Sequence, residues 1–124
     1  MHVATFSIKT GSSFSPASLA TLDSEETLVL LFGAPDLIDA PHRIREVVDA
    51  CPRSHVMGCS TAGEIHGCEI SDDSMAVAAV RFDDTPIRTA HAAVHSPNDS
   101  YAAGHAIAAQ LREPSLRGVL VLSD

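Results

Sequence analysis

Six apolar runs of strand length, separated by stretches of helical spacing, constrain the fold of this chain more than any other feature. Strands that alternate with helices are typical of α/β domains built around one sheet. We therefore predict an α/β fold with a mixed β-sheet and helices, in the order β-α-β-α-β-β-β-α-β. The predicted strands cover residues 2–8, 27–32, 54–59, 74–82, 86–95 and 117–122, and the predicted helices cover residues 16–22, 36–50 and 99–111.

The connections between the runs predict the directions of the strands. Each of the first three strands is separated from the next by a helix, which favours right-handed parallel crossovers. The short link at residues 83–86 joins the fourth and fifth runs and favours an antiparallel hairpin, so the sheet should be mixed. Pro41 lies inside the second helical stretch, and we expect the regular helix to begin there, with proline in its first turn.

The length of 124 residues predicts a single domain, residues 1–124. The last apolar run, at residues 117–122, is not followed by a helix that would cover it. Because exposed apolar edge strands promote aggregation, we expect this domain to be the N-terminal part of a longer protein. A small complete domain whose last strand lies at an edge is the alternative.

Charge and composition exclude several classes of function. Sixteen acidic and eight basic residues give a formal net charge of -8, which argues against nucleic-acid partners, since these require clustered Lys and Arg. The sequence has no polybasic patch, no signal peptide and no apolar stretch of about 18 residues, so we expect no membrane partner and a cytoplasmic location. Cys51, Cys59 and Cys68 fit no disulfide framework, and we expect Cys51 and Cys68 to be buried.

One short stretch, VMGCSTAGEI at residues 56–65, stands out for its chemistry. Its apolar first half is followed by small and hydroxylated residues and then by a carboxylate. Small residues let backbone N–H groups approach a ligand, so the stretch can hold a carboxylate or a phosphate. The alternative is a plain turn, in which Gly58 permits close packing, Gly63 takes a positive φ, and Ser60 and Thr61 bind their own backbone.

The same stretch resembles the signature of the N-terminal domain of FIST proteins, a family of intracellular sensory proteins. The pattern G-C-S-T-A-G-E-I is long and unusual in composition, and the resemblance extends over nearly the whole chain. It includes TLVLLFGAPD at 27–36, DDSMAVAAVRF at 72–82, VHSPNDSYAAGHAIAAQL at 94–111 and GVLVLSD at 118–124. The resemblance implies a signal-input domain that binds small ligands such as amino acids and acts in signal transduction without catalysis. It also implies a C-terminal FIST domain, or a signalling partner such as a kinase or a chemoreceptor.

The residues that match the signature are the candidate ligand-binding residues. We expect backbone N–H groups of residues 60–63 to bind a carboxylate and Glu64 to bind an ammonium group. Lys9 follows the first strand, and if that strand runs parallel to the third, Lys9 lies at the same sheet edge and can complement the carboxylate. The candidates from the signature are Gly58, Cys59, Ser60, Thr61, Ala62, Gly63 and Glu64.

Catalytic and metal sites find little support in the sequence. The hydrolase pattern G-x-S-x-G needs its nucleophile between two glycines, whereas four residues separate Gly58 from Gly63. Cys59, His66 and Cys68 lack the paired C-x-x-C spacing of structural zinc sites. We therefore predict that the protein is not an enzyme and has no metal site.

The identity of a cofactor stays unknown, with haem as one alternative. Some FIST relatives are described as haem-containing nitric oxide sensors, so the resemblance also allows a haem-based sensing domain. The sequence has no C-x-x-C-H attachment motif, and spacing alone selects no axial ligand from the seven histidines. A non-catalytic interaction domain is the third alternative. The histidines are His2, His42, His55, His66, His91, His95 and His105.

Overall fold

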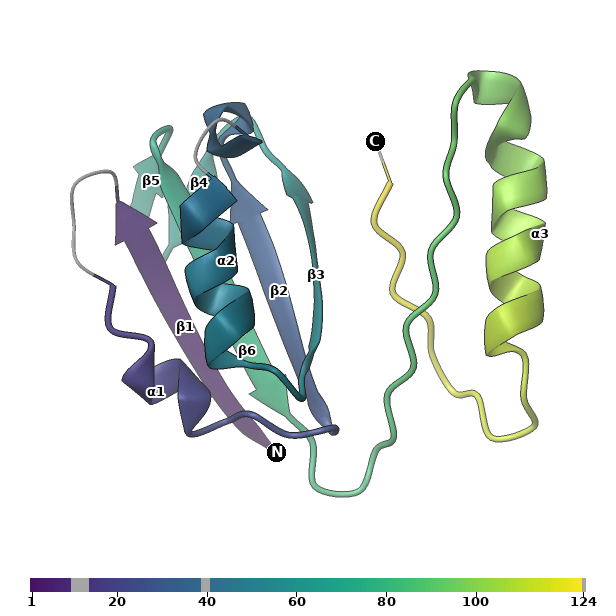
Figure 1. Cartoon of the computed structure of the whole chain (residues 1–124), viewed down its shortest axis with the longest axis horizontal. Helices are drawn as coiled ribbons and strands as arrows, with labels where there is room; N and C mark the ends of the chain where they lie inside the picture. The colour runs from purple at the N-terminus through teal and green to yellow at the C-terminus, as the bar shows by residue number, and fades with distance from the viewer. Residues whose placement is uncertain (10–13, 39–40, 124) are drawn as a thin grey trace. The chain divides into compact units, whose positions relative to one another are not determined.

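The computed structural model describes residues 1–9, 14–38 and 41–123, which divide into two compact units (Figure 1). The first unit consists of Met1–Ile87 with Leu122–Asp124, and the second consists of Arg88–Val121. The main sheet belongs to the first unit, and the longest helix, α3 (Ser100–Leu111), belongs to the second. In the described part of the chain, no helix is both long enough and apolar enough to cross a membrane.

Four strands form the main sheet of the first unit, in the order β1-β6-β2-β3. β2 and β3 are parallel, whereas β6 lies between β1 and β2 and is antiparallel to both. The predicted mixed sheet is therefore confirmed, and β1 runs in the same direction as β3. The strands are β1 (His2–Lys9), β2 (Thr27–Gly33), β3 (His55–Ser60) and β6 (Ser74–Arg81).

The helices of the first unit cover one face of this sheet. Figure 1 shows α1 (Ala17–Ala20) and α2 (Pro41–Ala50) together on that face, and the 3-10 helix η1 (Pro35–Ile38) follows β2. α2 begins at Pro41 as predicted. The fixed φ of proline suits the first turn, and its lack of an N–H costs nothing there because the N–H groups of a first turn have no acceptor within the helix. The buried core between the helices and the sheet consists of Ile8, Leu19, Val29, Leu31, Val47, Cys51, Met75, Val77 and Ala79.

The burial of β2 follows the strand period of two. Thr27, Val29, Leu31 and Gly33 are buried, whereas the residues between them are half-buried. Because successive side chains of a strand point to opposite faces, the buried set faces the helices. The apolar run of β2 therefore supplies the core on one face and a half-exposed apolar surface on the other.

A short hairpin that the sequence did not predict follows β3. It consists of β4 (Glu64–His66) and β5 (Glu69–Ser71), paired antiparallel. Its turn contains Gly67, which among the described residues is the one with a positive φ, 61°. The expectation of a positive φ at Gly63 is therefore wrong, because the chain reverses four residues later.

Two predicted strands are absent from the described residues. Residues 86–95 form no strand, so the antiparallel hairpin predicted across residues 83–86 is wrong, and residues 117–122 form no strand either. Both segments are apolar, and Val94, Val119, Leu120 and Val121 are exposed. Apolar composition alone does not specify a strand, because strand formation depends on pairing with a second strand, which the local sequence does not determine. The helix predicted over 99–111 is confirmed as α3.

Candidate functional site

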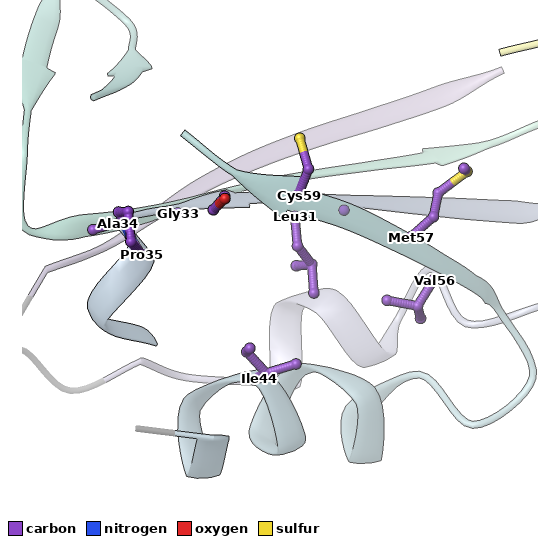
Figure 2. Close-up of a pocket in the computed structure, with 10 residues that line it drawn as sticks. Leu31, Gly33, Ala34, Pro35, Ile44, Val56, Met57 and Cys59 are labelled. Carbon is purple, nitrogen blue, oxygen red and sulfur yellow. The ribbon is translucent and has the colours of Figure 1, made fainter. Parts of the chain in front are cut away.

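A cavity of about 600 Å³ lies beside the ends of β2 and β3, next to α2. Figure 2 shows the side chains of Leu31 and Val56 pointing from the sheet toward Ile44 of α2, so apolar groups enclose the cavity from both layers. The cavity has the size and the mainly apolar wall of a small-molecule site. It is lined by Leu31, Gly33, Ala34, Pro35, Ile44, Val56, Met57, Gly58, Cys59 and Ser60.

Gly58 allows β3 to lie close to β2 at the middle of this wall. An added Cβ at position 58 would lie 2.2 Å from the backbone oxygen of Leu31 and 2.8 Å from its Cβ. Position 58 shares the helix-facing side of β3 with Val56 and Ser60, since alternate residues of a strand share a face. The missing side chain therefore satisfies a packing requirement and leaves room between β3 and α2.

Met57 and Cys59 are also among the residues that line the cavity, although their side chains belong to the other face of β3. Their side chains point away from α2 in Figure 2, opposite to Val56 and Ile44. Cys59 is half-buried and free of disulfide bonds. The thiol of Cys59 therefore does not face the space between the sheet and α2.

Glu64 lies outside the cavity wall, and its carboxylate is held by neighbouring groups of the protein. The side chain is buried, with 3% of the residue exposed. Oε1 accepts a hydrogen bond from Thr61 Oγ1 at 2.8 Å, and Oε2 accepts hydrogen bonds from the backbone N and the Oγ of Ser74 at 3.3 and 3.0 Å. Both oxygens expected to meet a ligand ammonium group thus already accept hydrogen bonds.

The predicted backbone cradle over residues 60–63 is partly occupied as well. The backbone N–H of Thr61 donates to the backbone oxygen of Gly33 at 2.9 Å, which continues the β2–β3 ladder by one residue. Ala62 is exposed and Gly63 is half-buried, and neither lines the cavity. Of the seven signature residues, the structure brings Gly58, Cys59 and Ser60 to the cavity.

Lys9 lies at the sheet edge expected for it, because β1 and β3 run in the same direction. Its Nζ donates to Glu69 Oε2 at 2.8 Å, and this hydrogen bond and positive charge lower the pKa of Glu69. Lys9 is not among the residues that line the cavity. The structure therefore places Lys9 with the β4–β5 hairpin.

The other two cysteines differ in burial. Cys51 is buried as predicted, and desolvation, followed by the nearby charge of Asp23, raises the pKa of its thiol. Cys68 is exposed in the turn of the β4–β5 hairpin, so its predicted burial is wrong. The reason is that Cys68 lies in the turn of the hairpin, where its side chain is exposed to solvent.

The structure adds cavity residues that the sequence analysis did not select. Gly33 is the last residue of β2, Ala34 and Pro35 follow it, and Ile44 lies on α2. The sequence does offer a signal for Gly33, Ala34 and Pro35, because small residues at the end of an apolar strand mark the same kind of sheet edge as the signature does. Within the described ranges, no histidine lines the cavity and no three metal-binding side chains gather at one place.

Comparison with known families accounts for most of the chain. Residues 27–124 match the family model of the FIST N domain. The matched span contains β2, β3, α2 and every residue that lines the cavity. No curated protein and no solved structure matches the chain.

Proposed function

Because the chain belongs to the FIST N domain family, which is a family of sensory domains, we propose that it binds a small metabolite such as an apolar amino acid. The observation that carries the proposal is the cavity of about 600 Å³ beside β3. Three residues of the family signature, Gly58, Cys59 and Ser60, belong to its wall. The proposed role is signal input, with a second FIST domain, a kinase or a chemoreceptor as the recipient of the signal.

The walls favour a ligand with an apolar part. Leu31, Val56 and Ile44 offer aliphatic surface from the sheet and from α2, and no charged side chain is among the lining residues described. Burying about 100 Å² of apolar ligand surface contributes about 2.5 kcal/mol. An aliphatic or aromatic amino-acid side chain supplies such a surface, whereas a charged side chain would lose its hydration without gaining a partner.

The polar end of the ligand has fewer partners than the signature suggested. Ser60 is the lining residue with a side-chain hydroxyl, and it lies exposed at the end of β3. The N–H groups of Thr61 and Ala34 donate to Gly33 and Ser74 within the protein. The proposed ligand therefore keeps its charged groups near Ser60, in contact with solvent, and places its apolar part inside.

A thermal-shift screen of the twenty amino acids against the 124-residue chain tests the proposal. A ligand at a hundred times its dissociation constant should stabilise the fold by about 2.7 kcal/mol. We expect apolar amino acids to raise the Tm and charged ones to leave it unchanged. Absence of any shift would contradict the proposal, and a Soret absorption band after incubation with haem would favour the haem alternative.

Two substitutions on α2 test whether the cavity is the binding site. Ile44 lines the cavity and Val48 does not, yet the two are similarly exposed, at 36% and 41%. Ile44→Asp places a carboxylate in the apolar wall and should abolish the thermal shift. Val48→Asp is the matched control and should preserve it. Equal shifts in both variants would locate the ligand elsewhere.

A further inference from the structure

Glu64 is a buried carboxylate in an unusual setting. Its hairpin has a polar inner face and an apolar outer face, since Glu64 is 3% exposed whereas Ile65 and Ile70 are 71% and 77% exposed. None of the ion pairs among the described residues includes Glu64, and its acceptor oxygens are satisfied by hydroxyl and backbone donors. Burial of a carboxylate is costly, and hydrogen bonds to the charged oxygens offset that cost.

The hydrogen bonds of Glu64 extend to three strand ends. Through Thr61 Oγ1, Glu64 holds the residue that follows β3, whose backbone N–H donates to Gly33 at the end of β2. Through Ser74, it holds the first residue of β6, whose backbone oxygen accepts a hydrogen bond from the N–H of Ala34 at 3.3 Å. One side chain therefore connects the ends of β2, β3 and β6.

These strand ends are also one end of the cavity. Gly33, Ala34 and Ser60 line it. Gly33 and Ala34 are hydrogen-bonded to Thr61 and Ser74, and Ser60 precedes Thr61 in the sequence. Glu64 itself does not line the cavity. Its influence on a ligand therefore acts through the backbone positions of the lining residues.

We infer that Glu64 is the positioning residue of the proposed ligand site: it fixes the end of the cavity formed by Gly33, Ala34 and Ser60 and does not contact the ligand. This inference rests on the proposed function for its biological meaning. Loss of the carboxylate would leave the buried donors of Ser74 without this acceptor and release the side chain of Thr61. The cavity end would then open locally while the core between the sheet and the helices stays intact.

Amide hydrogen exchange measured by NMR tests the positioning role without any ligand. In Glu64→Ala, the N–H groups of Thr61 and Ala34 should exchange at least tenfold faster, relative to those of Val29 and Val77 in the core. Glu64→Gln keeps one acceptor oxygen and should give an intermediate acceleration at Thr61 and Ala34. Wild-type rates at these two amides, or the same acceleration at all four, would overturn the inference.

Glu69→Ala is the matched control, because Glu69 lies on the same hairpin but is exposed and pairs with Lys9. This variant should leave exchange at Thr61 unchanged, and faster exchange there would count against a role specific to Glu64. If Glu64→Ala does not fold, Ser74→Ala removes one donor and should accelerate exchange at Ala34. Wild-type exchange at Ala34 in Ser74→Ala would then overturn the inference.

Titration with L-leucine separates the positioning role from the proposed function. If wild-type protein binds leucine, Glu64→Ala should weaken binding more than tenfold, Glu64→Gln less, and Glu69→Ala not at all. Unchanged affinity in Glu64→Ala would overturn the inference even if exchange is accelerated. If the wild-type protein binds neither leucine nor any other amino acid, the proposed function fails, and the exchange rates alone decide whether Glu64 positions the cavity end.

Discussion

Replacement of Gly58 by alanine should strongly destabilise the first unit. The new Cβ would lie 2.2 Å from the backbone oxygen of Leu31 and 2.8 Å from its Cβ. Both atoms belong to the neighbouring strand, and rotation of a side chain moves neither of them. The clash can be relieved only by separation of β3 from β2, which lengthens the hydrogen bonds of the parallel pair.

The magnitude follows from the character of this contact. Overpacking inside a well-packed region costs about 1–3 kcal/mol and occasionally more. Because the clash involves backbone, we expect a loss of about 3 kcal/mol, at the upper end of that range. For a domain of this size, such a loss lowers the Tm by at least about 10 °C.

Thermal and urea denaturation followed by circular dichroism measure the effect, with Gly63→Ala as the control. The Cβ added at Gly63 would meet Asp72 Oδ1 at 3.2 Å, at the end of an exposed side chain that can rotate away. We expect the control to stay within about 1 kcal/mol of wild type. An unchanged Tm in Gly58→Ala, or equal losses in both variants, would refute the reasoning from close strand approach.

Three further predictions concern reactivity, charge and packing. Cys68 should react with a thiol reagent in native protein much faster than Cys51, whose burial and raised pKa disfavour the thiolate; equal rates would contradict the described burial. Lys9→Met should raise the pKa of Glu69 in an NMR titration. Because folding lowers that pKa, the Lys9–Glu69 pair stabilises the wild-type protein above the ordinary pKa of glutamate. Lys9→Met should therefore be less stable than wild type at such pH, and the difference should vanish as the pH falls through the lowered value. Leu19→Ala removes a fully buried side chain and should cost about 2–5 kcal/mol in urea denaturation; a smaller loss would indicate a loosely packed α1.

The sequence predicted the strands and helices whose periodic patterns are long. β1, β2, β3 and β6 were identified because their apolar runs are of strand length, and α2 was placed correctly by Pro41. β4 and β5 were missed because each has three residues and presents its isoleucine to solvent, which inverts the usual pattern. The two false strands show the complementary limit, since pairing partners are non-local and a local apolar run does not specify them.

The ligand-binding role of the signature residues stays a prediction, but the structure shows which of these residues lie at the cavity. The signature lies at the end of β3, and Gly58, Cys59 and Ser60 line the cavity. The hydrogen bonds between Glu64 and Ser74 join residues on two different strands, so the sequence gives no sign of them. The contribution of Ile44 depends on how α2 packs over the sheet, which is likewise a tertiary property.

The position of β6 between β1 and β2 also determines the order in which the protein can assemble during synthesis. β2, α2 and β3 are consecutive and can pair as soon as Ser60 has been made. β1, although synthesised first, has its described sheet partner in β6, with Lys9 opposite Ser74 and His2 opposite Arg81. The first strand must therefore wait until the whole of β6 has been made, and this long-range closure should be the slow step of folding. A circular permutant that begins at β2 and carries β1 after residue 124 would make β6 before β1, so it would remove that delay and should fold faster around the same core.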